Sequence, residues 1–243
     1  MPVGDSTRYH VVLNSGGPDS LITYFALCRA FPGDIVASVY FDLGHRYALE
    51  EKLAAAMTVP DTLMLEPLRG LGEWEEEDAH IHLRNVFLIL AATKLFNENT
   101  TIYLSVQKDE MDIPDRKPLT LASINSLLTV LGIDASVKSL WNHKDKTDMV
   151  KQYVEMGGCK KKLYSTWSCY NPTRMYSNRR VVHCGDCPAC IRRHIAFVLG
   201  SGEDRTLYKN DPEKSDTAEK YEYRAKCGVY SEDRCKRILS VIK

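Results

Sequence analysis

A short glycine-containing segment near the start of the chain has the residue types that bind phosphate. Residues 14–20 read Asn-Ser-Gly-Gly-Pro-Asp-Ser, between an apolar run at 10–14 and a helical pattern at 21–31. Gly16 and Gly17 let the backbone turn its N–H groups toward a phosphate, and the helix N-terminus that follows favours negative charge. The segment predicts a phosphate site at the end of a first strand, where doubly wound sheets bind anions.

Three side chains of this segment are candidates for the chemistry itself. Ser15 and Ser20 have hydroxyls that can donate to phosphate oxygens, and the Asp19 carboxylate can hold Mg²⁺ or orient water. Pro18 suits a first helical turn, where its missing N–H costs nothing. The segment matches neither G-x-x-x-x-G-K-[ST] nor G-x-G-x-x-G. A glycine turn with a simple helix cap is the alternative interpretation.

Half of the eight cysteines fall in one short stretch. They follow the spacing C-x14-C-x2-C-x2-C and are Cys169, Cys184, Cys187 and Cys190. Four thiolates with no open position predict a structural zinc site, with an iron–sulfur cluster as the alternative. His183 stands beside Cys184, but four cysteines make it unnecessary as a ligand.

Short β-type runs alternate with longer amphipathic runs in the first two thirds of the chain. We expect strands at 10–14, 34–42, 61–65, 101–106 and 135–140, and helices at 21–31, 47–57, 81–96, 118–131, 144–156 and 188–199. The alternation predicts an α/β fold with a doubly wound, five-stranded parallel sheet covered on both faces. We expect a solvated loop over the acidic run at 73–78 and a weak helical pattern at 219–242.

Composition limits the classes of function. The 243 residues carry 32 basic and 32 acidic side chains, so net charge indicates neither a nucleic-acid nor a membrane partner. No apolar run approaches the roughly 20 residues of a membrane span, and we expect a cytoplasmic protein. Residues 159–193 hold an excess of basic side chains, which suits an anionic substrate or, alternatively, a zinc-ribbon module that binds nucleic acid. The expected units are 1–157 for nucleotide binding, 158–200 for zinc and 201–243 as an extension.

The segment S-G-G-P-D-S at 15–20 matches the signature of the PP-loop ATP pyrophosphatase superfamily. Further short motifs resemble those of the 7-cyano-7-deazaguanine synthase family of queuosine biosynthesis. They are Y-F-D-L-G-H-R at 40–46, L-R-N-V-F-L at 83–88, P-D-R-K-P at 114–118, T-W-S-C-Y at 166–170 and H-C-G-D-C-P-A-C-I-R-R at 183–193. Their order and spacing together identify the chain as similar to this family from about residue 11 to residue 197.

The resemblance implies an adenine nucleotide alpha hydrolase-like, Rossmann-like fold and a reaction of 7-carboxy-7-deazaguanine, ammonia and ATP. Carboxylate and amide oxygens would attack the α-phosphate in turn, and the product would be the nitrile. The implied ATP site comprises Leu13, Asn14, Ser15, Gly16, Gly17, Pro18, Asp19, Ser20, Tyr40, Phe41 and Asp42, with Leu43 beside the adenine. The implied substrate site comprises Arg84, Asn85, Asp115 and Arg116. The resemblance also implies a homodimer, which no residue pattern in the chain supports by itself.

Three departures separate the chain from the family pattern. The family has a longer stretch that ends in Tyr-Pro-Asp-Cys-Arg-Pro, whereas residues 108–118 are shorter here and place Arg116 where the cysteine would be. Residues 173–182 are extra, and the tail beyond residue 200 is long. An adenylating amide synthase or ligase that stops before the nitrile is therefore an alternative. A tRNA thiolase is a further one, but the C-x2-C pairs already serve the metal.

Overall fold

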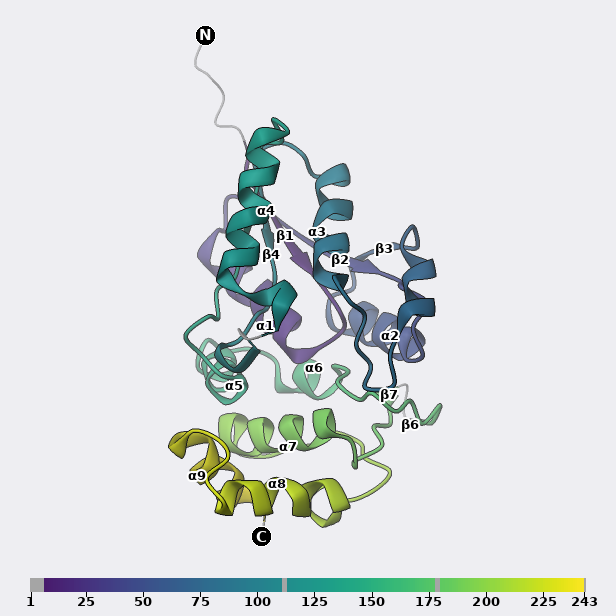
Figure 1. Ribbon diagram of the computed structural model, residues 1–243, viewed down its shortest axis with the longest axis vertical. Helices are drawn as coiled ribbons and strands as arrows, with labels where there is room; N and C mark the ends of the chain where they lie inside the picture. Colours follow the sequence, from purple (N-terminus) through teal and green to yellow (C-terminus); the bar gives the residue numbers. More distant parts are fainter. Residues whose placement is uncertain (1–6, 111–112, 178–179, 243) are drawn as a thin grey trace.

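The computed structural model describes residues 7–110, 113–177 and 180–242. Five parallel strands form one sheet in the order β3-β2-β1-β4-β5 (Figure 1). The strands are β1 (Tyr9–Leu13), β2 (Ile35–Phe41), β3 (Leu63–Leu65), β4 (Thr100–Tyr103) and β5 (Ala135–Lys138). The order reverses at β1, which pairs with β2 on one side and β4 on the other. This confirms the predicted doubly wound sheet and places a crevice at the carboxyl ends of β1 and β4.

Helices cover both faces of the sheet. The first five are α1 (Pro18–Ala30), α2 (Ala48–Thr58), α3 (Arg84–Leu95), α4 (Pro118–Val130) and α5 (Lys146–Glu155). The largest core cluster joins Val11, Val39 and Ile102 of the strands to Ile89 of α3 and Leu128 of α4, so α3 and α4 lie on one face. α1 packs on the other face, where its Leu27 contacts Val12 and Tyr103. The β-branched residues of each buried strand thus fill both sides of the sheet.

A second group of elements follows α5. It contains α6 (Lys160–Tyr164), a short hairpin of β6 (Tyr176–Ser177) and β7 (Arg180–Val181), and α7 (Pro188–Ser201). One core cluster joins Ile22 of α1, Met149 of α5, Leu163 of α6 and Phe197 of α7. This apolar contact crosses the expected boundary at residue 157, and the division into three units stays a prediction. The sequence pattern indicated neither α6 nor the hairpin.

Two helices follow residue 215, where the sequence indicated one weak helical pattern at 219–242. Two helices, α8 (Asp216–Lys226) and α9 (Glu232–Val241), lie with α7 in a layer below the sheet (Figure 1). Gly228, with a φ of +68°, ends α8 and separates it from α9. Tyr221, Ile238 and Val241 are buried against α7. The described residues contain no helix long and apolar enough to cross a membrane.

One expectation about local structure was wrong and a second holds only in part. The helix expected from residue 81 begins only at Arg84, because Leu83 has a φ of +56° and cannot continue a right-handed helix. The acidic run at 73–78 is only partly a solvated loop. Glu75 is half-buried and accepts a hydrogen bond from the Arg46 backbone N–H at 2.9 Å, and 3₁₀-helix η1 (Arg69–Trp74) precedes it. The ion pair between Glu75 and the Arg46 guanidinium fixes this part of the acidic run against the loop after β2.

Candidate active site and cysteine centre

A cavity of about 310 Å³ opens at the carboxyl edge of the sheet. It lies between the end of β1, the start of α3, the start of α5 and the layer of α7, α8 and α9. Most of the residues expected from the sequence line it. They are Leu13, Asn14, Ser15, Gly17, Pro18, Asp19, Ser20, Tyr40, Phe41, Arg84, Asn85 and Arg116, together with Leu43. Segments far apart in the sequence therefore meet at the crevice that the strand order creates.

Asn14 holds the glycine segment in place. Its side-chain carbonyl accepts from Gly16 N at 2.8 Å and from the Ser20 hydroxyl at 2.9 Å. Its amide group donates to the hydroxyls of Ser38 and Thr62, at 3.0 and 3.2 Å, on the neighbouring part of the sheet. Asn14 is 4% exposed, and a buried network with all its polar groups paired fixes one geometry.

The turn leaves backbone donors free at the start of α1. Gly17 is the N-cap residue and supplies no side-chain cap, and the first helical hydrogen bond runs from Leu21 N to Gly17 O. The N–H groups of Asp19 and Ser20 therefore have no partner within the helix. Such free donors and the helix dipole together attract an anion. The exposed Ser15 stands beside them on the cavity wall.

Gly16 shapes the turn without lining the cavity. It has a φ of +69°, and a Cβ at this position would lie 2.4 Å from Glu51 O of α2. Its carbonyl accepts from Trp167 N at 2.7 Å, which ties the turn to the segment after α6. Only glycine fits this conformation and this approach to α2.

Lys146, which the sequence did not single out, completes the charge arrangement around the turn. It is the first residue of α5, and its Nζ lies 2.9 Å from Oδ2 of Asp19. The other carboxylate oxygen of Asp19, Oδ1, is buried without a hydrogen-bond partner among the described residues. Burial raises the pKa of Asp19, and Lys146 opposes that rise. Asp19 thus has one paired oxygen and one left for a ligand.

The start of α3 presents a guanidinium and an amide to the cavity. Asp115 does not line the cavity; its Oδ2 accepts from Asn85 N at 3.1 Å and from Asn85 Nδ2 at 2.9 Å. These bonds orient Asn85, and its side-chain oxygen has no hydrogen-bond partner among the described residues. Burial acts to lower the pKa of Arg84, but Tyr47 and Glu51 raise it above the usual value. Arg84 therefore stays charged.

Arg116 is paired with an acid that sequence reasoning missed. Its Nη1 lies 2.6 Å from Oε2 of Glu110, in the segment that follows β4. Burial acts to raise the pKa of Glu110, but Arg116 and Lys146 lower it below the usual value. Residues 111–112 of the same segment are outside the described part of the chain. Asp42, another expected ATP residue, also lies outside the cavity wall and accepts from Gly44 N at 2.9 Å.

The C-terminal layer forms one wall of the cavity, which the sequence did not predict. Tyr221 of α8 and Arg234, Arg237 and Ile238 of α9 line it. Arg237 forms ion pairs with Asp145 and Asp148 at the start of α5. α9 is thereby tied to the helix that carries Lys146.

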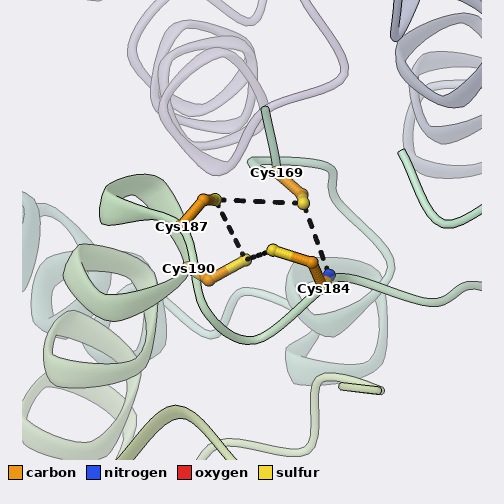
Figure 2. A group of neighbouring side chains, drawn as sticks. All are labelled: Cys169, Cys184, Cys187 and Cys190. Carbon is orange, nitrogen blue, oxygen red and sulfur yellow. Dashed lines mark hydrogen bonds between the residues drawn. The ribbon is translucent and has the colours of Figure 1, made fainter. Parts of the chain in front are cut away.

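The four expected cysteines meet in one place (Figure 2). Their Sγ atoms all lie within 4.8 Å of one another, and three of the pairs are 3.5, 3.8 and 3.9 Å apart. Zinc at about 2.3 Å from each sulfur of a tetrahedron implies sulfurs about 3.8 Å apart. The donor set and its spacing therefore fit a structural zinc ion.

Backbone N–H groups support the sulfurs. Cys169 Sγ accepts from Asn171 N at 3.3 Å and from Cys184 N at 3.4 Å, and Cys184 Sγ accepts from Asp186 N at 3.3 Å. A hydrogen bond with Cys169 lowers the pKa of Cys184 to about 7. Backbone N–H groups that donate to sulfur stabilise thiolates and orient metal ligands. His183 is not part of the set; it is buried beside Trp167 and accepts from Ser168 N.

Several basic side chains of residues 159–193 form hydrogen bonds or ion pairs within the protein. The Arg193 side chain is buried and donates to Thr206, Thr166 and Leu163 O. Arg174 pairs with Glu50, and Lys160 donates to Ser201 O. Arg179 is outside the described residues. These contacts occupy part of the basic excess of this segment within the protein, while Lys161 and Lys162 are exposed.

Known proteins have sequences similar to this chain. The family model of the queuosine biosynthesis protein QueC matches residues 61–200. A 7-cyano-7-deazaguanine synthase of Methanocaldococcus jannaschii is 27% identical over 238 residues, covering 82% of this chain and 98% of that protein. The Pyrococcus abyssi enzyme of that name is 28% identical over 183 residues, covering 72% of this chain and 74% of its own. The Pyrococcus furiosus one is 41% identical over 68 residues, 28% of this chain and 27% of that protein. The chain belongs to the QueC family of queuosine biosynthesis proteins.

Proposed function

We propose that this protein converts 7-carboxy-7-deazaguanine and ammonia to 7-cyano-7-deazaguanine at the expense of ATP. The observation that carries the proposal is the pair formed by Lys146 and Asp19 beside the uncapped start of α1, at the crevice between β1 and β4. The names of the relatives and the shared family support the same reaction.

The nucleotide would lie along the ends of β1 and β2. Leu13, Tyr40 and Phe41 offer apolar contacts for adenine, and the Tyr40 hydroxyl is already held by Ala48 O at 2.8 Å. The free N–H groups of Asp19 and Ser20, the Ser15 hydroxyl and Lys146 would bind the β- and γ-phosphates. These groups stabilise the charge that develops on departing pyrophosphate.

Magnesium would bind at Asp19. Its Oδ1 is a buried carboxylate oxygen without a partner among the described residues, and Mg²⁺ prefers such hard oxygen ligands beside phosphate. The ion would neutralise phosphate charge when bound. Lys146 would hold the other oxygen of Asp19 and keep the carboxylate ionised.

The acid substrate would lie on the α3 side of the cavity. The free side-chain oxygen of Asn85 would accept from an N–H of the deazapurine, with Asp115 fixing the orientation of Asn85. Arg84 would pair with the carboxylate. The protein would bring the carboxylate oxygen, and later the amide oxygen, in line with the α-phosphate, so that positioning supplies much of the rate. Ammonia would displace AMP in the first round, and the second AMP would leave as the nitrile forms.

A product-mass experiment tests this function. Purified protein would be incubated with ATP, Mg²⁺, ammonia and 7-carboxy-7-deazaguanine, and the products read by mass spectrometry. We expect the nitrile, with two AMP and two pyrophosphate released for each acid consumed. Accumulation of the amide with one AMP would instead support an amide synthase. No AMP release with this acid would refute the proposal, and Ser20→Ala should serve as the low-turnover control.

Assembly and location are separate proposals. Exposed apolar side chains gather on α4, where Leu119, Leu127 and Val130 are 78%, 45% and 82% exposed, and we propose that they contribute to a homodimer. Sedimentation of wild type and Val130→Glu would test it; a wild-type monomer would refute it.

We place the protein in the cytoplasm, because a four-thiolate centre needs reducing surroundings.

A further inference from the structure

The first turn of α5 is held by a residue from near the end of the chain. Asp145 is the N-cap of α5, and its Oδ1 accepts from Asp148 N at 3.0 Å. Arg237 of α9 donates from Nη1 to Oδ2 of Asp145, and from Nη2 to Oδ1 of Asp148 at 3.3 Å. Lys146, whose Nζ lies 2.9 Å from Asp19, stands between these two acids in the chain. One guanidinium group therefore spans the helical turn from which Lys146 projects.

Packing fixes the helix that carries Arg237. Ile238, the next residue, is 2% exposed and belongs to one core cluster with Ile195 of α7. α7 itself packs closely on the first turn of α5, since a Cβ at Gly200 would lie 2.7 Å from Thr147 O. The contact between Arg237 and α5 is thus made from a helix docked in the core.

The charges around this turn divide into two sets. Arg237 pairs with Asp145 and Asp148, and Lys146 pairs with Asp19. Asp145 and Lys146 both line the cavity. Without Arg237, the Asp145 carboxylate would lose its ion pair beside Lys146 and would compete with Asp19 for the ammonium group. Arg237 therefore leaves Lys146 available to Asp19.

We propose that Arg237 is a positioning residue for the phosphate site: by holding Asp145, it directs Lys146 toward Asp19 and the nucleotide. This inference rests on the proposed function, in which Lys146 and the start of α1 bind the β- and γ-phosphates. Arg237 acts on bound ATP through Lys146 and needs no contact of its own with the nucleotide. Small displacements of a binding group can cost much of its effect, so a distant arginine can matter to the site.

Equilibrium binding tests the inference without the acid substrate. Titration calorimetry at fixed Mg²⁺ would measure Kd for ATP and for AMP, which lacks the β- and γ-phosphates. We expect Arg237→Gln to bind ATP about 3- to 30-fold more weakly, as for coupling within one ion-pair network. Kd for AMP should stay within about two-fold of the wild-type value. Arg237→Lys should recover part of the ATP affinity, because it keeps the charge but not the two-pronged geometry.

Two combined variants separate positioning from other effects. In the Lys146→Met protein, adding Arg237→Gln should cause little further loss of ATP affinity, since Arg237 acts through Lys146. In the Arg237→Gln protein, adding Asp145→Asn should restore most of the affinity, because asparagine removes the competing charge and still caps the helix. An equal loss from Arg237→Gln with and without Lys146 would overturn the inference, since repulsion by the unpaired acid would then explain it. No recovery with Asp145→Asn would overturn it too, because displacement of α9 would then be the cause.

Lys236→Gln is the matched control, because Lys236 is an exposed residue of the same helix and pairs along it with Glu232. It should bind ATP as wild type does, and every variant should keep the wild-type zinc content. Unchanged ATP affinity in Arg237→Gln would overturn the inference, and so would an equal loss for ATP and AMP. If ATP affinity depends on Arg237 as expected but the acid yields no nitrile, the role of Arg237 stands and the proposed reaction fails.

Discussion

Lys146 at the start of α5 reaches Asp19 in the glycine turn, with 2.9 Å between Nζ and Oδ2. Asp19 lies near the start of the chain and Lys146 is the first residue of α5, and they meet at the site proposed for pyrophosphate. Burial raises the pKa of Asp19, and Lys146 is the strongest influence in the other direction. The ionisation of Asp19 therefore depends on a residue outside the recognisable motif.

Replacing Lys146 should change the pH dependence of turnover. Lys146→Met removes the charge that lowers the pKa of Asp19, so that pKa should rise further above its usual value. If turnover needs the carboxylate form, the acid limb of the kcat/KM profile should move to higher pH. Lys146→Arg keeps the charge and should leave the limb near its wild-type position. Superimposable acid limbs for wild type and Lys146→Met would contradict this account of Asp19.

Two glycines with similar backbones should differ in their tolerance of alanine. Gly16 and Gly132 have φ values of +69° and +68°, but only the Gly16 Cβ would strike another group, Glu51 O at 2.4 Å. Gly132→Ala should cost about 1 kcal/mol of unfolding free energy from the left-handed conformation alone. Gly16→Ala should cost about 2 kcal/mol or more and also abolish AMP release. Urea unfolding measures both, and equal losses would show that the contact with α2 imposes no restriction.

Loss of one cysteine sulfur should remove the metal. Cys187 Sγ lies 3.5 Å from Cys190 Sγ and 3.9 Å from Cys169 Sγ, so Cys187→Ser leaves an incomplete thiolate set. We expect zinc content to fall from about one per chain to near zero and the unfolding free energy to fall by about 3 kcal/mol or more. Cys227→Ser changes an exposed thiol outside the cluster and should stay within about 0.5 kcal/mol of wild type. Iron instead of zinc in the purified protein would refute the metal assignment.

His194 should make stability depend on pH near neutrality. Its ring nitrogens lie 3.0 Å from Asp204 and 3.0 Å from Glu213, and these acids raise its pKa although burial acts to lower it. A raised folded pKa stabilises the fold fully below the unfolded value near 6.5 and loses that effect as pH rises through the folded value. The loss of unfolding free energy in His194→Gln should therefore be larger at about pH 6 than at about pH 9. An equal loss of unfolding free energy at the two pH values would show that the His194 ring acts only through packing.

The contiguous parts of the site were readable from the sequence. Glycines after an apolar run and cysteines at metal spacing act through neighbours in the chain, so Gly17, Ser20 and Cys187 needed no tertiary information. The sheet followed from alternating patterns. Gly228 and Ser231 were available signals for the break between α8 and α9, since glycine ends helices and serine begins them.

Other parts depend on contacts between distant segments. Asp115 was expected to touch the substrate, but its carboxylate instead orients Asn85, 30 residues away. From the sequence alone, Lys146 is an ordinary lysine in the first turn of a helix. Its contact with Asp19 follows only from the packing of α5 beside α1. Arg237 pairs with the carboxylates of Asp145 and Asp148, whereas Arg192 donates to the hydroxyl of Tyr170. This difference depends on how α7 and α9 pack in the fold. Sequence periodicity indicates a helix but not which cavity its polar face will meet.

The position of α9 has a consequence for how the protein becomes active. Glycine-turn residues near the start of the chain and Ile238 near its far end line the same cavity. During synthesis, the nucleotide-binding sheet can form long before α9 leaves the ribosome, but the wall that α9 provides cannot. A nascent or proteolytically shortened chain lacking α9 would keep the turn and the cysteine centre, yet its reaction chamber would remain open to water on one side.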